Sequence, residues 1–299
     1  MTYGVIDVGS NTIRLCIYDV REGRVTSLFN NKNTAGLVGY VNDGELSRKG
    51  IRKACDVLCT YQEMARRAGI ETLYVFATAS LRNISNTDEA VREIQKQTGL
   101  SVDVLSGYDE AVLDFEGASH ARQLKDGLLV DIGGGSTEIL SFADGEIRDA
   151  VSLEIGSLFL YKNYVGKLFP KQKERKAIRS KVDAELKKVD FLKQNEFPEM
   201  IGIGGTIRAV KKFNNDLLGL DNTNEIILTE NLQLMDNILQ DEEKQTLKKV
   251  LRIAPDRVHT LIPGMLILER ICKVCGCKQI QMSGFGVREG YLYRKVVKK

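Results

Sequence analysis

Residues 128–140 combine glycines with acidic and hydroxyl side chains, the residue types that bind phosphate and divalent cations. An apolar run ends in Asp131, three consecutive glycines follow, and then come Ser136, Thr137 and Glu138. Three adjacent glycines lose much backbone entropy on folding, so a plain hairpin would rarely use them. They let several backbone N–H groups point at one anion, and the surrounding oxygen atoms suit magnesium. The stretch predicts a phosphate and metal site, with a polar tight turn as the simpler alternative.

The start of the chain repeats this pattern. Residues 5–12 form an apolar run interrupted by Asp7, followed by Gly9, Ser10 and Asn11 and then by a second apolar run. Two such copies in one chain indicate an internally duplicated architecture. Each copy would present one glycine turn and one aspartate, and we expect the two turns to face each other across a cleft.

Alternating apolar and amphipathic segments predict an α/β fold with parallel strands added to an antiparallel meander. The predicted strands are residues 3–8, 12–20, 25–30, 72–77, 102–105, 128–132, 136–142, 200–206 and 279–282, with a further one after the Asp144-Gly145 turn. The predicted helices are residues 48–68 after an N-cap at Ser47, 87–98 with Thr87 as the cap, a helix starting near Tyr108, 157–165, 171–193, 207–213, a mostly helical region 229–251, 265–274 and 287–297. Residues 31–46 and 77–83 are expected to be loops.

Composition excludes several classes of protein. The 299 residues carry a formal net charge of +3, which gives no sign of nucleic-acid binding. We find no secretory signal and no apolar run long enough for a membrane span, and six cysteines in such a chain predict reduced thiols. The expectation is a cytoplasmic protein without membrane or nucleic-acid partners.

The cysteines offer a weaker hypothesis. Cys272, Cys275 and Cys277 could suggest zinc, but structural zinc needs four ligands and the chain has only two histidines and no second CxxC pair. Buried thiols are the better interpretation. Cys55 and Cys59 lie one helical turn apart and are expected in the core.

Five ordered motifs carry a family resemblance. They are residues 7–15, 106–111, 131–138, 204–206 and 286–290. The chain resembles the exopolyphosphatase and guanosine pentaphosphate phosphohydrolase family (Ppx/GppA), within the actin-like ATPase superfamily. The resemblance implies two duplicated actin-like (ribonuclease H-like) domains, each a mixed sheet flanked by helices. It implies domains at residues 1–124 and 125–299, an active site in the interdomain cleft, and a closing helix, 287–297, that returns to the first domain.

The same resemblance implies a reaction and its residues. The reaction is release of terminal phosphate from polyphosphate or guanosine pentaphosphate, dependent on magnesium or manganese. Glu110 matches the catalytic glutamate and Arg82 an arginine near the site, while Asp131, Glu138 and Asp7 would serve the metal. The residues that would contact phosphate are Ser10, Asn11, Gly134, Gly135, Ser136, Thr137, Gly205 and Thr206. The alternative for Glu110 is an ordinary first-turn acid favoured by the helix dipole.

Two departures leave other functions open. Asp109 and Val112 differ from the family pattern around Glu110. An ATP-dependent phosphotransferase of the same fold and a non-catalytic alarmone or nucleotide sensor therefore remain alternatives. The choice between polyphosphate and guanosine pentaphosphate stays open, as does a homodimer. The lysine-rich segment 171–193 could guide a polyanion, although a solvated helix face is the commoner meaning.

Overall fold

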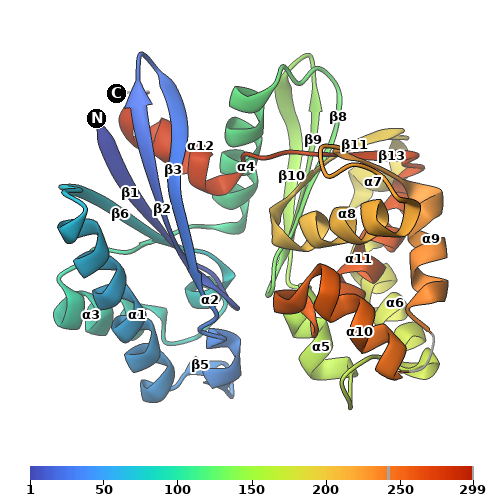
Figure 1. Cartoon of the computed structure of the whole chain (residues 1–299), viewed down its shortest axis with the longest axis horizontal. Helices are drawn as coiled ribbons and strands as arrows, with labels where there is room; N and C mark the ends of the chain where they lie inside the picture. The colour runs from blue at the N-terminus through green and yellow to red at the C-terminus, as the bar shows by residue number, and fades with distance from the viewer. Residues whose placement is uncertain (241–242, 298–299) are drawn as a thin grey trace. The chain divides into compact units, whose positions relative to one another are not determined.

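The computed structural model describes residues 1–240 and 243–297. The chain divides into two compact units, Met1–Leu113 together with the chain from Arg288 on, and Asp114–Val287 (Figure 1). This division falls within helix α4 (Gly107–Ala121), ahead of the expected boundary between residues 124 and 125. No helix among the described residues is both long and apolar enough to cross a membrane.

The first unit contains a five-stranded sheet in the order β3-β2-β1-β6-β7. Strands β1 to β3 form an antiparallel meander, and β6 and β7 join it in parallel. The strands are β1 (Thr2–Val8), β2 (Ile13–Arg21), β3 (Arg24–Asn33), β6 (Thr72–Ala77) and β7 (Asp103–Val104). The segment expected as a loop before Ser47 holds a short 3₁₀ helix and a small hairpin: η1 (Leu37–Tyr40), β4 (Val41–Asn42) and β5 (Glu45–Leu46).

Strand alternation assigns the two faces of this sheet to different helices. Ile6 and Val8 belong to the hydrophobic core that also contains buried residues of α1 (Arg48–Arg67) and α3 (Thr87–Thr98). The opposite face carries Tyr18 and Phe76, and α12 (Val287–Leu292) packs there through Tyr291, whose ring centroid lies 4.8 Å from that of Phe76. A π-helical turn, η3 (Tyr293–Val297), follows α12. Because Asp7 alternates with Ile6 and Val8, it lies on the α12 face.

Local signals explain where the helices of this unit begin and end. The Ser47 side chain accepts from the Gly50 N–H, which confirms the predicted cap of α1. The predicted cap at Thr87 is wrong, because Asn86 holds the cap position and the Thr87 hydroxyl donates to the carbonyls of Leu81 and Ile84. The loop expected at 77–83 is also wrong in part: it contains the short helix α2 (Ala79–Arg82), closed by main-chain bonds to Thr78.

The second unit contains a six-stranded sheet in the order β10-β9-β8-β11-β13-β12. Strands β8, β9 and β10 form an antiparallel meander, and β11 and β13 join in parallel. The order β10-β9-β8-β11 in this sheet therefore repeats the order β3-β2-β1-β6 in the sheet of the first unit. The strands are β8 (Gly127–Ile132), β9 (Thr137–Ala143), β10 (Glu146–Leu153), β11 (Glu199–Ile203), β12 (Ile226–Leu228) and β13 (Gln279–Met282).

Helix α11 (Leu261–Cys275) forms the centre of the second unit. Most of its side chains are buried, as is typical of a helix that is apolar on all sides. The helices around it and elsewhere in the unit are α5 (Ser157–Tyr164), α6 (Gln172–Leu186), α7 (Asp190–Gln194), α8 (Gly204–Leu218), α9 (Thr229–Ile238), α10 (Glu243–Ile253) and the 3₁₀ turn η2 (Pro255–Arg257). On the other face of the sheet, Phe115 of α4 packs against Phe142 of β9, with their ring centroids 5.3 Å apart.

Two predicted boundaries in this unit are wrong. The long helix at 171–193 is two helices, α6 and α7, because the N–H groups of Lys188 and Val189 turn back to Glu185 and Leu186 and bury the Val189 side chain. The strand expected through residue 206 ends at Ile203, where Gly204 already starts α8. The prediction of a mostly helical region at 229–251 is confirmed by α9 and α10, and its residues 241 and 242 lie outside the described residues.

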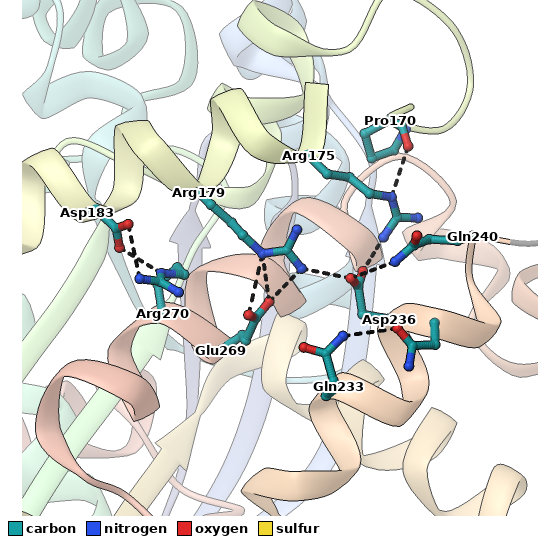
Figure 2. Close-up of polar contacts among 10 residues, drawn as sticks. Pro170, Arg175, Arg179, Asp183, Gln233, Asp236, Gln240, Glu269 and Arg270 are labelled. Carbon is teal, nitrogen blue, oxygen red and sulfur yellow. Dashed lines mark hydrogen bonds and ion pairs between the residues drawn. The ribbon is translucent and has the colours of Figure 1, made fainter. Parts of the chain in front are cut away.

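A buried ionic network joins α6, α9 and α11 (Figure 2). Arg175 and Arg179 of α6 both contact Asp236 of α9, and Arg179 also reaches Glu269 of α11 with an Nη2–Oε2 distance of 2.8 Å. The side chains of Arg175 and Asp236 are each only 2% exposed. Buried charges need partners on all sides, so this network fixes how α6 and α9 pack on the central helix.

Candidate active site

The two glycine turns have the same closure. In the first unit the Gly9 N–H donates to the Thr12 carbonyl at 3.1 Å, and in the second the Gly133 N–H donates to the Ser136 carbonyl at 3.0 Å. Each turn has four residues between antiparallel strands, and each is preceded two residues earlier by an aspartate, Asp7 or Asp131. The sequence repeat therefore corresponds to a repeat of backbone geometry.

Three contacts within the first unit hold its turn. The Val38 N–H donates to the Ser10 carbonyl at 3.1 Å, and the Gly36 N–H donates to the Asn11 carbonyl at 2.9 Å. The Ser80 hydroxyl donates to the Val8 carbonyl at the end of β1. With these carbonyls satisfied from outside, the turn is rigid and Ser10 is buried.

Asp7 lies among charged groups on the α12 face. Burial raises the pKa of its carboxyl group, and the positive charges of Arg288 and Arg14 act in the opposite direction. The Arg288 Nε lies 3.9 Å from Asp7 Oδ2, and its Nη1 lies 3.3 Å from the sulfur of Cys16. The next residue, Glu289, accepts a 2.5 Å hydrogen bond from the Tyr18 hydroxyl. The motif at residues 286–290 thus places the positively charged Arg288 side chain beside Asp7.

Arg82 and Glu110 form an ion pair within the first unit. The Arg82 Nη1 lies 2.6 Å from Glu110 Oε2 and 3.3 Å from the Leu105 carbonyl, and Glu110 is 7% exposed. Glu110 stands in the first turn of α4, which Ser106 starts by accepting from the Asp109 N–H at 3.0 Å. The two predicted catalytic residues are therefore in contact, and the predicted action of Arg82 on a phosphate stays a prediction.

The glycine turn of the second unit is bound to the start of α5. Gly133 accepts from the N–H and the hydroxyl of Ser157, at 2.9 and 3.0 Å, and Gly134 accepts from the N–H groups of Leu158 and Phe159. A Cβ at Gly156 would overlap the Gly134 carbonyl. Gly156 must therefore lack a side chain so that the turn can lie against the helix.

Asp131 and Glu138 face each other across the hairpin. They are directly paired residues of β8 and β9, so their side chains share one face of the sheet. Glu138 is 1% exposed and accepts from the Ser152 hydroxyl at 2.7 Å. Within residues 1–240 and 243–297, no three His, Cys, Asp or Glu side chains are grouped to hold a metal. Magnesium commonly uses one or two carboxylates and completes its shell with water and substrate phosphate, so this pair fits that ion.

The start of α8 lies directly against this pair. Gly204 has a φ of 84°, and a Cβ there would overlap the Asp131 carboxylate. A Cβ at Gly205 would overlap the Arg257 guanidinium, and the Thr206 hydroxyl lies 3.5 Å from that of Ser157. The second unit therefore gathers both carboxylates, the glycine turn, a helix N-terminus and one arginine, a set that suits a phosphate with a bound cation.

Sequence reasoning missed two residues of this set. Arg257 lies in the 3₁₀ turn η2, between two helices and outside every recognisable motif. Ser157 was expected only as the start of a helix, although it contacts both Gly133 and Thr206. Only the tertiary contacts with the two glycine segments reveal these residues as part of the site.

These features define an α/β protein with two glycine turns of equal geometry, each beside an aspartate, and with donor groups of the kind that suit a phosphate. Comparison with known proteins gives the same class. The chain belongs to the Ppx/GppA phosphatase family, whose model matches residues 16–299.

Relatives and solved structures agree over the whole chain. The chain is 25% identical over 308 aligned residues to a Mycobacterium tuberculosis protein named exopolyphosphatase 1, covering 99% of this chain and 88% of that protein. It superposes with a TM-score of 0.88 on a crystal structure of an exopolyphosphatase from Cytophaga hutchinsonii, at 24% identity, covering 100% of this chain and 98% of that one. A Ppx/GppA member from Aquifex aeolicus gives a TM-score of 0.80 at 22% identity, covering 100% and 98%. The predicted two-domain actin-like fold is confirmed.

Proposed function

We propose that the protein is a magnesium-dependent hydrolase that releases terminal phosphate from polyphosphate, with guanosine pentaphosphate as a second substrate of the same site. The observation that carries this proposal is the repeated turn geometry, in which an aspartate stands beside a turn able to bind a phosphate. The exopolyphosphatase names of full-length relatives support the choice of polyphosphate.

The second unit would hold the phosphate. Backbone N–H groups of Gly134 and Gly135 and the hydroxyls of Ser136 and Thr206 would bind its oxygens, with Gly205 allowing the close approach of Arg257. The hydroxyl of Thr137, which the sequence also predicted as a phosphate ligand, instead donates to the Ile155 carbonyl at 2.6 Å in a fully buried position. Arg257 would add a fixed positive charge, as guanidinium groups commonly do at phosphate sites. Asp131 and Glu138 would hold magnesium, which would neutralise charge that develops on the phosphate oxygens.

The first unit would provide the turn of Ser10 and Asn11 and the group that acts on water. Asp7 would serve the metal through water, and Arg288 keeps a positive charge beside it. Glu110 would accept a proton from the attacking water. This role requires first of all that the carboxylate lies within hydrogen-bond distance of that water. Its ion pair with Arg82 fixes the carboxylate at the start of α4.

The test is phosphate release from a panel of polyphosphate, guanosine pentaphosphate and ATP, with magnesium and with excess chelator, in water enriched in ¹⁸O. We expect release that needs magnesium or manganese, with one labelled oxygen in each released phosphate because water is the acceptor. Unlabelled product transferred to another acceptor would indicate a phosphotransferase. Binding of guanosine pentaphosphate without turnover of any substrate would indicate a sensor, and full activity in chelator would contradict the metal assignment.

A further inference from the structure

Three free cysteines meet where α11 ends, within the second unit. Cys272, Cys275 and Cys277 are 1%, 0% and 5% exposed, so all three thiols are buried together. They belong to none of the residues assigned to phosphate, metal or water above. Within the described part of the chain, these three thiols are not grouped so that they could hold a metal ion.

The end of α11 brings two of these residues face to face. Gly276 has a φ of 67°, and its N–H and that of Cys277 both donate to the Cys272 carbonyl, the latter at 2.9 Å. This left-handed closure of a helix places the residue after the glycine against the residue five positions earlier. Cys272 and Cys277 are therefore neighbours across the end of the helix, and a disulfide between them would close a short loop.

The surroundings favour Cys277 as the reactive thiol. Hydrogen bonds from the thiols of Cys272 and Cys275 lower the pKa of Cys277 to about 4, against the effect of burial, and the nearby Thr229 hydroxyl acts in the same direction. The same contacts raise the pKa of the Cys272 and Cys275 thiols. In its protonated form Cys277 instead donates to the Gln279 carbonyl at 3.1 Å. A thiolate is the form of cysteine that reacts with oxidants.

We propose that this cluster is a redox modification site, in which a peroxide oxidises Cys277 and Cys272 then closes a disulfide with it. In the first step the Cys277 thiolate attacks one peroxide oxygen, the O–O bond breaks, and hydroxide leaves. This forms a sulfenic acid, with the sulfur oxidised by two electrons and the peroxide reduced. In the second step the Cys272 sulfur attacks the Cys277 sulfur, the S–O bond breaks, and water leaves as the disulfide forms.

The experiment is hydrogen peroxide treatment of the folded full-length protein, followed by non-reducing peptide mapping over time. Cys59 of α1 serves as the internal control, because it is exposed and not in the core as the sequence predicted. Cys277 should be oxidised about ten-fold faster than Cys59, because oxidation follows thiolate character and the contacts around Cys277 lower its pKa. The mapped product should be a Cys272–Cys277 disulfide.

Variants separate the two partners. Cys275→Ser should keep the Cys272–Cys277 disulfide, whereas Cys272→Ser should stop at a Cys277 sulfenic acid that dimedone traps. Oxidation of Cys59 while the cluster retains free thiols would overturn the proposal, as would a dominant Cys275–Cys277 disulfide. The wild-type competition with Cys59 needs no variant, so a poorly folding substitution leaves the test intact.

Discussion

The conformation of Gly204 controls the position of Asp131. Its positive φ lets α8 start against the Asp131 carboxylate, where even a methyl group would overlap. The sequence indicated Asp131 and the glycines separately, but it could not show that they touch. Arg82 and Glu110 are a second case: each was predicted, yet the sequence could not show that Arg82 of α2 forms an ion pair with Glu110 of α4.

We predict that Gly204→Ala weakens metal activation. The added Cβ must displace the Asp131 carboxylate, so the magnesium concentration for half-maximal activity should rise by about 10-fold to 100-fold, the usual effect of disturbing the support of a ligand. Gly219→Ala is the matched control, because Gly219 also has a positive φ, 64°, but no atom lies within 4 Å of an added Cβ. Both variants should lose about 1 kcal/mol of stability from backbone strain. An unchanged magnesium requirement in Gly204→Ala would contradict the assignment of Asp131.

At the scale of elements, sequence patterns located most strands and helices, because period-two and helical periodicity follow directly from which side chains are buried. They failed where tertiary contacts decide the outcome. The break between α6 and α7 buries Val189, and no helix-breaking residue marks it. The short helix α2 was missed because four residues are too few to show a helical periodicity.

We predict that Asp236→Asn destabilises the second unit. It leaves Arg175 buried with a weakened partner, and breaking one side of a buried ion pair costs about 3–5 kcal/mol. Denaturant unfolding should show this loss, while magnesium-dependent activity per folded molecule stays the same. Asp190→Asn removes the exposed pair with Lys193 and is the control, expected to change little. Equal stability of the two variants would contradict the role given to the network in Figure 2.

We predict that the contact between α12 and β7 makes a pH-dependent contribution to the free energy of unfolding. Burial acts to raise the pKa of Asp103, but hydrogen bonds from Lys295 and Tyr291 outweigh it and lower the pKa below its usual value. A lowered pKa in the folded state gives stability that is present above the unfolded pKa of about 3.9. That stability is lost as the pH falls through the folded value.

The measurement is the free energy of unfolding of wild type and Asp103→Asn across pH. The wild type should be more stable at neutral pH, and the difference should shrink as the pH falls below about 4. A difference that stays constant down to pH 2 would show that the carboxylate charge does not anchor α12.

For the whole molecule, the internal repeat was the most informative feature of the sequence. It predicted two sheets of like topology, and both have the meander followed by parallel strands. The sequence also showed which turns carry aspartate. The amphipathic pattern of α12 did not show which sheet it packs on. That position becomes visible only in the folded chain, where Arg288 contacts Asp7 and Glu289 contacts Tyr18.

The central claim is that Glu110 of the first unit and the carboxylates of the second unit serve one hydrolytic reaction. The most direct measurement is magnesium-dependent phosphate release from polyphosphate by the Glu110→Gln variant. The control is Asp109→Asn, at the neighbouring acid whose carboxylate accepts a hydrogen bond from the Ser106 hydroxyl at the helix start. We predict that Glu110→Gln stays folded and binds polyphosphate but loses about 10²- to 10⁴-fold in turnover, because an amide cannot take the proton from water. Asp109→Asn should retain most activity. A folded Glu110→Gln protein that releases phosphate at close to the wild-type rate would contradict the account.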